Sequence, residues 1–367
     1  MKKLVVVLVG TGLLFVQSLS SQAAAFTPGD LVVLRVGDGS AALGIPAAPC
    51  YLEEYTVAGT LVQTIAMPAT TGGGNNTFTL GGNSVAEGFL ELSGNGQLIT
   101  LAGYNAAPGF SGPGGSSIST VNRVVGVVSL NGNVDTSTLL TAGTSASLRS
   151  AFTDNGSHFW IGATGGSSYV GTAGGSTTAT LMNNSNFRVV RNFGGQLYAS
   201  SAAGSSFGIV TVGTGLPTTA SQTATLLPGF PTTTGPSPYD FFRSGNNLWV
   251  TDDRVNGNGG LQHWLFNGAS WSLQYTIARS ATVGARGLTV DNSGVTPLFY
   301  VTTTDNNVDL VVDNGTQASS TETTLFSDGT ASTAFRGIVY LTPVPEPTTL
   351  SLAGGFGLLL FFLRRRR

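Results

Sequence analysis

The sequence predicts an all-β fold: a β-propeller of six four-stranded blades, closed by pairing of its N- and C-terminal strands. Three observations support this prediction. Charged residues make up only 9% of the chain and glycine contributes 52 residues, a composition that favours strands and turns. A strand, a tight polar turn and a second strand recur along the chain. The last copy of this pattern is incomplete, and three strands near the N-terminus belong to no copy.

Each repeated unit begins with a charged residue and an apolar strand. The six units start at Glu87, Arg149, Arg188, Asp240, Arg286 and Arg336. These starts are 39 to 62 residues apart, about fifty on average, which is typical of one four-stranded blade. A second strand pair follows in most units, as in segments 261–266 and 271–277. The Asn267-Gly268 turn between them is a strong hairpin signal.

The closure of the ring is predicted from the incomplete copy at 336–341. Segments 30–36, 51–57 and 61–67 are the strands without a unit, and the C-terminal strand would complete them as one blade. Such a ring has no exposed sheet edge. Five or seven blades remain alternatives, because the step from 87 to 149 is long. A solenoid or a sandwich is the competing fold, although neither explains the split unit.

The N-terminus has the features of a secretory signal peptide. Lys2 and Lys3 precede the apolar run 4–16, and the alanines at 23–25 provide a small-residue cleavage site. Residues 1–25 are therefore predicted to be removed. An uncleaved anchor is the poorer alternative, because the apolar run is short and polar residues follow it at once. Residues 26–343 would form the exported propeller domain, and residues 344–367 a separate C-terminal segment.

The C-terminal segment combines three features in a fixed order. Val344, Pro345, Glu346 and Pro347 predict an extended hinge, because each proline lacks a backbone donor and restricts the residue before it. The apolar run 350–363 follows and is predicted to enter the membrane as a helix. Four arginines then end the chain and would stay on the cytoplasmic side: Arg364, Arg365, Arg366 and Arg367.

This order resembles the PEP-CTERM sorting signal, and the resemblance covers residues 344–367. It implies cleavage near Pro345 to Pro347 by an exosortase-type membrane protease, in a Gram-negative bacterium that secretes exopolysaccharide. It further implies export by the Sec route, transient anchoring in the inner membrane, and delivery to the cell surface or the extracellular matrix. A plain C-terminal membrane anchor is the alternative, with the same topology and no cleavage.

The predicted exported domain is mildly acidic. Of the 16 basic residues in the chain, six lie in the two end segments, which leaves ten arginines against 17 of the 18 acidic residues and a net charge of −7. An acidic surface without lysine argues against nucleic acid and anionic lipid as partners. Cys50 is the only cysteine, so an intramolecular disulfide is excluded.

Neither a catalytic set nor a metal or cofactor site is predicted. The two histidines, His158 and His263, fall in different units, and zinc-binding motifs do not occur. Loops 305–309 and 252–258 are rich in side-chain oxygens, but the first lacks the glycine and the closing glutamate of an EF-hand. Both are interpreted as polar turns at which calcium remains an open alternative. An enzyme, such as a metal-dependent propeller hydrolase or lactonase, is the weakest functional alternative.

The charged residues that start the units form the candidate site. If each unit starts with its innermost strand, these residues make a ring of four arginines and two carboxylates around the central channel. The favoured interpretation is a belt of ion pairs, Glu87 with Arg149 or Arg336 and Asp240 with Arg188 or Arg286. The alternative is a site for an anion, such as a uronate or sulfate group of an acidic polysaccharide.

Aromatic residues suggest a second way to bind a glycan. Four of them recur in the second strand of their units, which predicts packing between blades: Trp160, Tyr198, Trp249 and Tyr300. Trp264 and Trp271 flank a turn and are predicted to form an exposed patch. The expected function is that of a structural or binding component of the cell surface or exopolysaccharide matrix, with a lectin-like glycan-binding propeller as the alternative.

Overall fold

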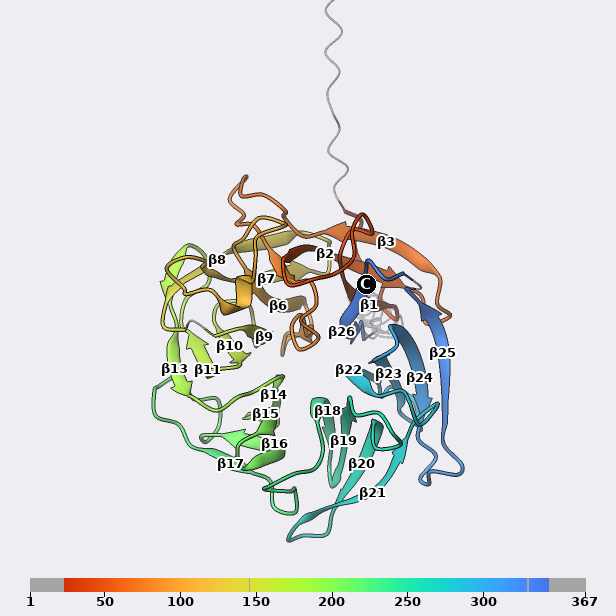
Figure 1. Ribbon diagram of the computed structural model, residues 1–367. Coiled ribbons are helices and arrows are strands. Elements are labelled where there is room, and N and C mark those ends of the chain that lie inside the picture. Colours follow the sequence, from red (N-terminus) through yellow and green to blue (C-terminus); the bar gives the residue numbers. More distant parts are fainter. Residues whose placement is uncertain (1–22, 145, 329, 343–367) are drawn as a thin grey trace, which may run out of the picture.

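The computed structural model describes residues 23–144, 146–328 and 330–342, which form a ring of β-sheets around a central axis (Figure 1). Apart from the short 3-10 helix η1 (Pro113–Gly115), all secondary-structure elements in these ranges are β-strands. The all-β, propeller-like prediction is therefore confirmed. Residues 1–22 of the predicted signal peptide and the whole sorting segment 344–367 lie outside the described residues.

Four sheets are separate four-stranded blades, and each runs in chain order from the inside of the ring to its rim. The first blade comprises β9 (Leu148–Phe152), β10 (Phe159–Ala163), β11 (Gly166–Val170) and β13 (Thr180–Asn183). The second comprises β14 (Val190–Phe193), β15 (Gln196–Ala203), β16 (Ser206–Val212) and β17 (Ala224–Leu226). The third comprises β18 (Pro238–Ser244), β19 (Asn247–Asp252), β20 (Gly260–Phe266) and β21 (Trp271–Ile277). The fourth comprises β22 (Ala285–Asp291), β23 (Leu298–Thr303), β24 (Asn307–Val312) and β25 (Thr321–Ser327).

The other ten strands form one continuous sheet that completes the ring. They are β26 (Ala334–Tyr340), β1 (Leu31–Val36), β2 (Ala47–Tyr55), β3 (Leu61–Ala66), β4 (Thr79–Gly81), β5 (Glu91–Leu92), β6 (Leu98–Tyr104), β7 (Arg123–Ser129), β8 (Val134–Ala142) and β12 (Ser176–Thr178). The prediction of six four-stranded blades is wrong, because the described residues form four separate four-stranded sheets and one ten-stranded sheet. The short strand β4 pairs with both β2 and β6 and so joins two of the predicted units.

The ring closes as predicted. The C-terminal strand β26 pairs antiparallel with β1, and Ile338 lies opposite Val33. The inner strand β26 also contacts β22 on one side and β5 on the other. The first and last strands of the described chain therefore share one sheet, in which β1 is paired on both sides, with β2 and β26.

Turn chemistry explains why the hairpins form where the sequence predicts them. The β14–β15 turn consists of Gly194 and Gly195, with φ angles of 61° and 79°. A two-residue turn with both φ angles positive matches the right-handed twist of the flanking strands, and only glycine adopts this conformation without strain.

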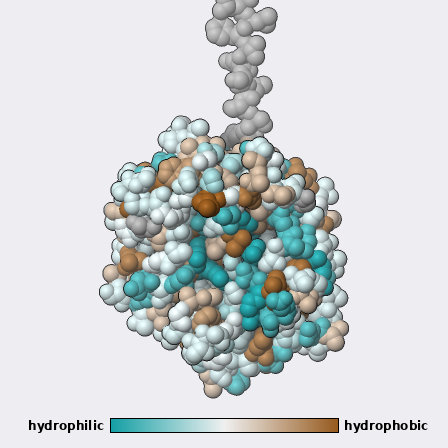
Figure 2. Space-filling view, in the orientation of Figure 1, coloured by the Kyte–Doolittle hydropathy of each residue, from teal (hydrophilic) through white to brown (hydrophobic). Residues whose placement is uncertain are grey.

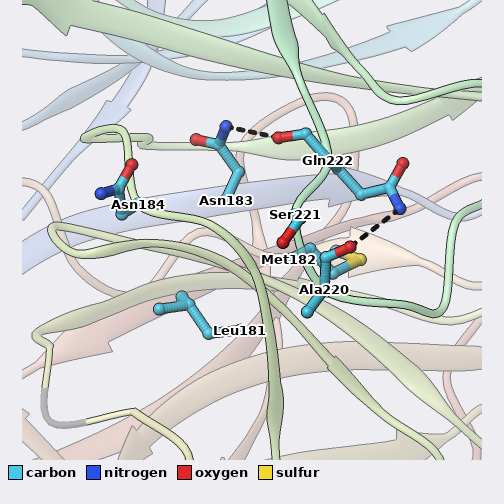
Figure 3. Close-up of a pocket in the computed structure, with 7 residues that line it drawn as sticks. All are labelled: Leu181, Met182, Asn183, Asn184, Ala220, Ser221 and Gln222. Atoms are coloured by element: carbon cyan, nitrogen blue, oxygen red, sulfur yellow. Dashed lines mark hydrogen bonds between the residues drawn. The ribbon is translucent and has the colours of Figure 1, made fainter.

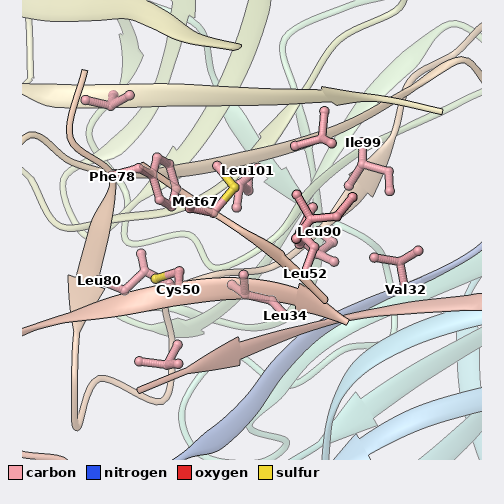
Figure 4. Close-up of a cluster of buried hydrophobic side chains, with 14 of the residues drawn as sticks. Val32, Leu34, Cys50, Leu52, Met67, Phe78, Leu80, Leu90, Ile99 and Leu101 are labelled. Carbon is pink, nitrogen blue, oxygen red and sulfur yellow. The ribbon is translucent and has the colours of Figure 1, made fainter. Parts of the chain in front are cut away.

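The hydrophobic core is divided into clusters between neighbouring sheets. The largest lies within the ten-stranded sheet and contains Cys50 and Phe78, both fully buried (Figure 4). The four recurring aromatics are buried as predicted, and the Trp249 ring lies 4.9 Å from Phe299 of the next blade. Trp264 and Trp271 are also buried, at 4% exposure each, so the prediction of an exposed tryptophan patch is wrong. Trp264 stacks on Phe230 at 4.0 Å, which the local turn pattern did not indicate.

Within the described ranges, no helix has the length and apolarity needed to cross a membrane. The predicted membrane helix falls on residues 350–363, outside these ranges.

Candidate functional site

β-Bulges in the innermost strands position the residues that start the units. In β22, Arg286 and Gly287 together oppose the single residue Thr302, because the register shifts between Ala285 and Leu288. The same shift places Arg336 at a bulge in β26 and Arg149 at a bulge in β9. A bulge bends its strand and redirects a side chain, and bulges are common next to functional sites.

Hydroxyl groups of the second strands hold these bulges in place from the neighbouring blade. Thr251 donates a hydrogen bond to the Arg286 carbonyl oxygen, and Thr302 donates to the Arg336 carbonyl oxygen at 2.6 Å. Ser150, which lies in the innermost strand β9, donates to the Arg188 carbonyl oxygen at 3.0 Å. The backbone of Arg188, Arg286 and Arg336 is thus fixed by a side chain from the preceding unit.

The third blade departs from the predicted ring by one residue. Its bulge consists of Tyr239 and Asp240 opposite Thr251, and Ser200 of the preceding blade donates to the Tyr239 carbonyl oxygen. Tyr239 therefore occupies the position that arginine occupies in the other units. Asp240 follows it, at the position of Gly287 in the fourth blade, and its side chain pairs with Arg191 instead of with the arginines that start the units.

Arg149 and Arg188 bind residues at or just before the start of the next innermost strand. Arg149 Nη1 donates to Asn186 Oδ1 at 2.7 Å and to the Phe187 carbonyl oxygen at 2.9 Å. Arg188 Nη1 donates to the Pro238 carbonyl oxygen at 2.7 Å, and its Cζ lies 3.9 Å from the centre of the Tyr239 ring. Both side chains are half-buried.

Arg286 and Arg336 also lie near Tyr239. Arg286 Cζ is 5.8 Å from the Tyr239 ring centre, and its Nε is 3.7 Å from Asp253 Oδ2. Arg336 is only 4% exposed and donates from Nη2 to the Gly82 carbonyl oxygen at 3.1 Å. The Nε atoms of both arginines are buried without a hydrogen-bond partner.

Glu87 completes the group. One of its carboxylate oxygens accepts from Tyr104 Oη at 2.8 Å and the other from the Gly81 backbone nitrogen at 2.9 Å. We call this group the arginine cluster, and its members are Glu87, Arg149, Arg188, Tyr239, Asp253, Arg286 and Arg336. Figure 2 shows hydrophilic side chains gathered around the centre of the face seen along the ring axis.

Like charges lie close together in this cluster. Burial and the neighbouring Arg188 lower the pKa of Arg149 to about 10, and burial and Arg286 lower the pKa of Arg336 to about 10. Burial raises the pKa of Glu87 despite the hydrogen bonds from Gly81 and Tyr104. The cluster is therefore a positively charged site within a domain whose net charge is negative.

The predicted belt of ion pairs does not form. In the described ranges, no carboxylate lies within 4 Å of the Arg149, Arg188 or Arg336 nitrogens, and Arg286 approaches Asp253 rather than Asp240. Asp240 pairs instead with Arg191, through two hydrogen bonds of 2.8 and 3.0 Å. The predicted pairing fails because the bulge in β18 turns Asp240 away from the arginines.

The other candidates from the sequence have structural partners. Arg279 donates to Asp309 at 2.8 Å and to Asp305 at 3.0 Å, so a guanidinium group lies where the first calcium loop would need its cation. Arg254 binds Asp252 in the second loop. The described residues contain no group of three or more histidines, cysteines or carboxylates that fits a metal ion.

A pocket between β13 and the loop 220–222 is lined by uncharged residues (Figure 3). The lining comprises Leu181, Met182, Asn183, Asn184, Ala220, Ser221 and Gln222. Asn183 donates to the Gln222 carbonyl oxygen across the pocket, and Gln222 donates to the Ala220 carbonyl oxygen of its own loop. Without a charged side chain in its lining, this pocket offers no charge-based recognition comparable to that of the arginine cluster.

Tyr239 and Arg191 were missed by the sequence reasoning, and Asp253 was indicated only as part of the oxygen-rich loop 252–258. A signal for Tyr239 exists in the second strands, where Tyr198-Ala199-Ser200 and Trp249-Val250-Thr251 match. Arg188 precedes Ser200 by twelve residues, and the same count back from Thr251 gives Tyr239. Asp253 and Arg191 have no comparable repeat signal.

No protein-family model matches the chain, and no curated protein is detectably similar to it in sequence. Several solved structures resemble it at low identity. A periplasmic gluconolactonase of Pseudomonas aeruginosa is 12% identical, with 80% of this chain and 82% of that chain covered and a TM-score of 0.48. A chain of a nidogen/laminin complex is 12% identical, with 84% and 97% covered and a TM-score of 0.48. AztD of Citrobacter koseri is 13% identical, with 80% and 70% covered and a TM-score of 0.37. At these values the likenesses carry no conclusion about ligand or activity.

Proposed function

We propose that this chain is an exported propeller that binds acidic glycans at the arginine cluster, as a component of the cell surface or exopolysaccharide matrix. One observation carries the proposal. Four arginines from four units converge on the channel, and three of them have no carboxylate partner in the described part of the chain. Guanidinium groups bind carboxylate and sulfate groups through paired N–H donors, so a uronate or a sulfated sugar has the matching chemistry.

The unused donors favour a ligand over a purely structural role. Arg149 and Arg188 direct Nη1 toward the protein, and the Nε atoms of Arg286 and Arg336 are buried without an acceptor. Burying a charged group without a partner costs free energy. A bound anion would offset the repulsion between neighbouring arginines.

Replacement of single arginines tests this function. We expect each of the variants Arg149→Gln, Arg188→Gln and Arg286→Gln to weaken binding of trigalacturonate about ten-fold, because each removes a hydrogen bond to a charged group. Isothermal titration calorimetry measures the loss, with neutral maltotriose as the control ligand. High salt should also weaken binding.

A matched control variant is available on β18. Arg243 belongs to the same strand as Tyr239, but it donates to Tyr198 Oη at 2.6 Å and lies outside the arginine cluster. Arg243→Gln should leave trigalacturonate affinity unchanged. Equal affinities for the wild type and all three cluster variants would reject the proposed site.

Export and sorting through the two ends of the chain form part of the same proposal. The boundaries of the folded part support it, since Phe26 and Leu341 are both buried and Phe26 donates its backbone N–H to Leu130. The exported domain 26–343 is thus consistent with the folded ring. Mass spectrometry of protein recovered outside the cell should find Phe26 at one end and a terminus near Pro345 to Pro347 at the other. Recovery with Arg364 to Arg367 retained would contradict the sorting proposal.

A further inference from the structure

A second charged cluster closes the channel next to the arginine cluster. It is called the channel plug here and consists of Glu91 of β5, Arg191 of β14 and Asp240 of β18. Arg191 Nε lies 2.8 Å from Asp240 Oδ1 and 3.0 Å from Glu91 Oε1. Its Nη2 donates to the Leu288 carbonyl oxygen of β22 at 2.9 Å. The channel plug therefore joins four inner strands across the ring axis.

The channel plug is buried, and its Arg191–Asp240 pair is held by two hydrogen bonds. The side chains of Glu91, Arg191 and Asp240 are 5%, 15% and 1% exposed. Asp240 also accepts hydrogen bonds from the backbone nitrogens of Phe241 and Leu288. Burial raises the pKa of Glu91 well above its usual value, although Arg191 opposes this. The buried Arg191–Asp240 pair is costly to open, because either charge alone would be left unpaired.

The arginine cluster and the channel plug occupy successive levels of the channel. Asp240 directly follows Tyr239, Arg191 lies three residues after Arg188, and Glu91 lies four residues after Glu87. At about 3.3 Å per residue, these offsets amount to no more than about 13 Å. Phe89, fully buried and 5.6 Å from the Tyr239 ring, fills space between the two levels. A ligand at the arginines therefore cannot continue through the ring.

We infer that the arginine cluster receives the acidic end of a glycan chain, or a single acidic sugar, and does not bind the interior of a long chain. This inference rests on the proposed function. A chain threaded through the ring would have to displace the channel plug. A chain lying flat across the face would run along a domain whose net charge is negative, which repels a polyanion. End-on entry avoids both costs.

Calorimetry with galacturonate oligomers of increasing length tests the inference. For end-on binding, the affinity per molecule rises up to a short oligomer and then stays constant, and a long polygalacturonate binds one protein per chain end. Binding of several proteins along each long chain, with an affinity that grows with length, would overturn the inference. The same wild-type titrations separate the two claims: no binding of any oligomer contradicts the proposed function itself, whereas binding along the polymer contradicts only the end-on mode.

The chemistry of the chain ends provides a second readout. Oligogalacturonate reduced at C1 to an alditol differs from the parent only at the reducing end, and an oligomer with an unsaturated terminal uronate differs only at the non-reducing end. End-on recognition predicts that one of these two changes weakens binding at least ten-fold while the other has little effect. Equal affinity of both modified oligomers and the parent would contradict end-on recognition.

Discussion

Buried charged residues that lack some of their hydrogen-bond partners account for much of the electrostatic character of this propeller. Asp309 of β24 is fully buried, and its Oδ1 and the Glu322 Oε2 of β25 are both buried without a hydrogen-bond donor. Arg279 binds the other Asp309 oxygen at 2.8 Å. Burial and the adjacent Asp309 raise the pKa of Glu322 to about 8. Glu322 therefore holds a proton near neutral pH, which lets the two carboxyl groups share it.

The raised pKa of Glu322 predicts how the free energy of unfolding depends on pH. The folded pKa of Glu322 lies above its usual value of 4.5, so the folded state holds a proton that the unfolded chain releases. The stabilisation is fully present below about pH 4.5 and is lost as pH rises to about 8. Glu322→Gln, which does not titrate and donates from its amide, should be more stable than the wild type at pH 9 by about 1 to 2 kcal/mol and similar at pH 5.

Denaturant unfolding of both proteins at pH 5, 7 and 9 measures this difference. The comparison isolates Glu322, because Glu87, Glu91 and Asp240 also have raised pKa values and affect both proteins equally. A stability difference between the variant and the wild type that is the same at pH 5 and pH 9 would show that the two carboxyl groups do not share a proton.

At the level of the strands, the sequence predicts the elements better than their registers. Alternating apolar residues and Gly-rich turns identify the hairpins, because side-chain period and turn geometry are local properties. A bulge adds one residue without disturbing either signal. In β18 the pattern therefore marks Asp240 as the start of the unit, whereas the bulge makes Tyr239 the equivalent of the arginines.

Because the sequence pattern is local, it also gave the wrong number of blades and the wrong exposure for the tryptophans. The strand β4 has only three residues, Thr79–Gly81, and its pairing with β2 and β6 depends on segments far away in the sequence. The burial of Trp264 likewise depends on Phe230, which lies in a different unit. Local pattern contains no information about either contact. The sequence could indicate the four arginines as a set only because they recur at the same step of a repeat.

At the level of the whole molecule, closure by β1 and β26 links the two ends of the folded chain. The arginine cluster depends on this closure, because Arg336 belongs to β26 and is fixed by Thr302 of the adjacent blade. If the closing strand detached, one of the four arginines would leave the cluster and β1 would expose a free edge. Ligand binding and closure should therefore be coupled.

A disulfide between β1 and β26 tests whether these strands hold the ring closed. Val33 and Ile338 are opposite each other in the β1–β26 pair, so the double variant Val33→Cys, Ile338→Cys places two thiols on facing positions. The native Cys50 is buried and remains in the background. A bridge that closes so long a loop should stabilise the oxidised protein over its own reduced form by about 3 to 5 kcal/mol. Denaturant unfolding with and without reductant measures the difference, and trigalacturonate affinity should be retained in the oxidised form. Failure of the bridge to form, or equal unfolding midpoints in both forms, would show that the two ends are not held together in the native ring.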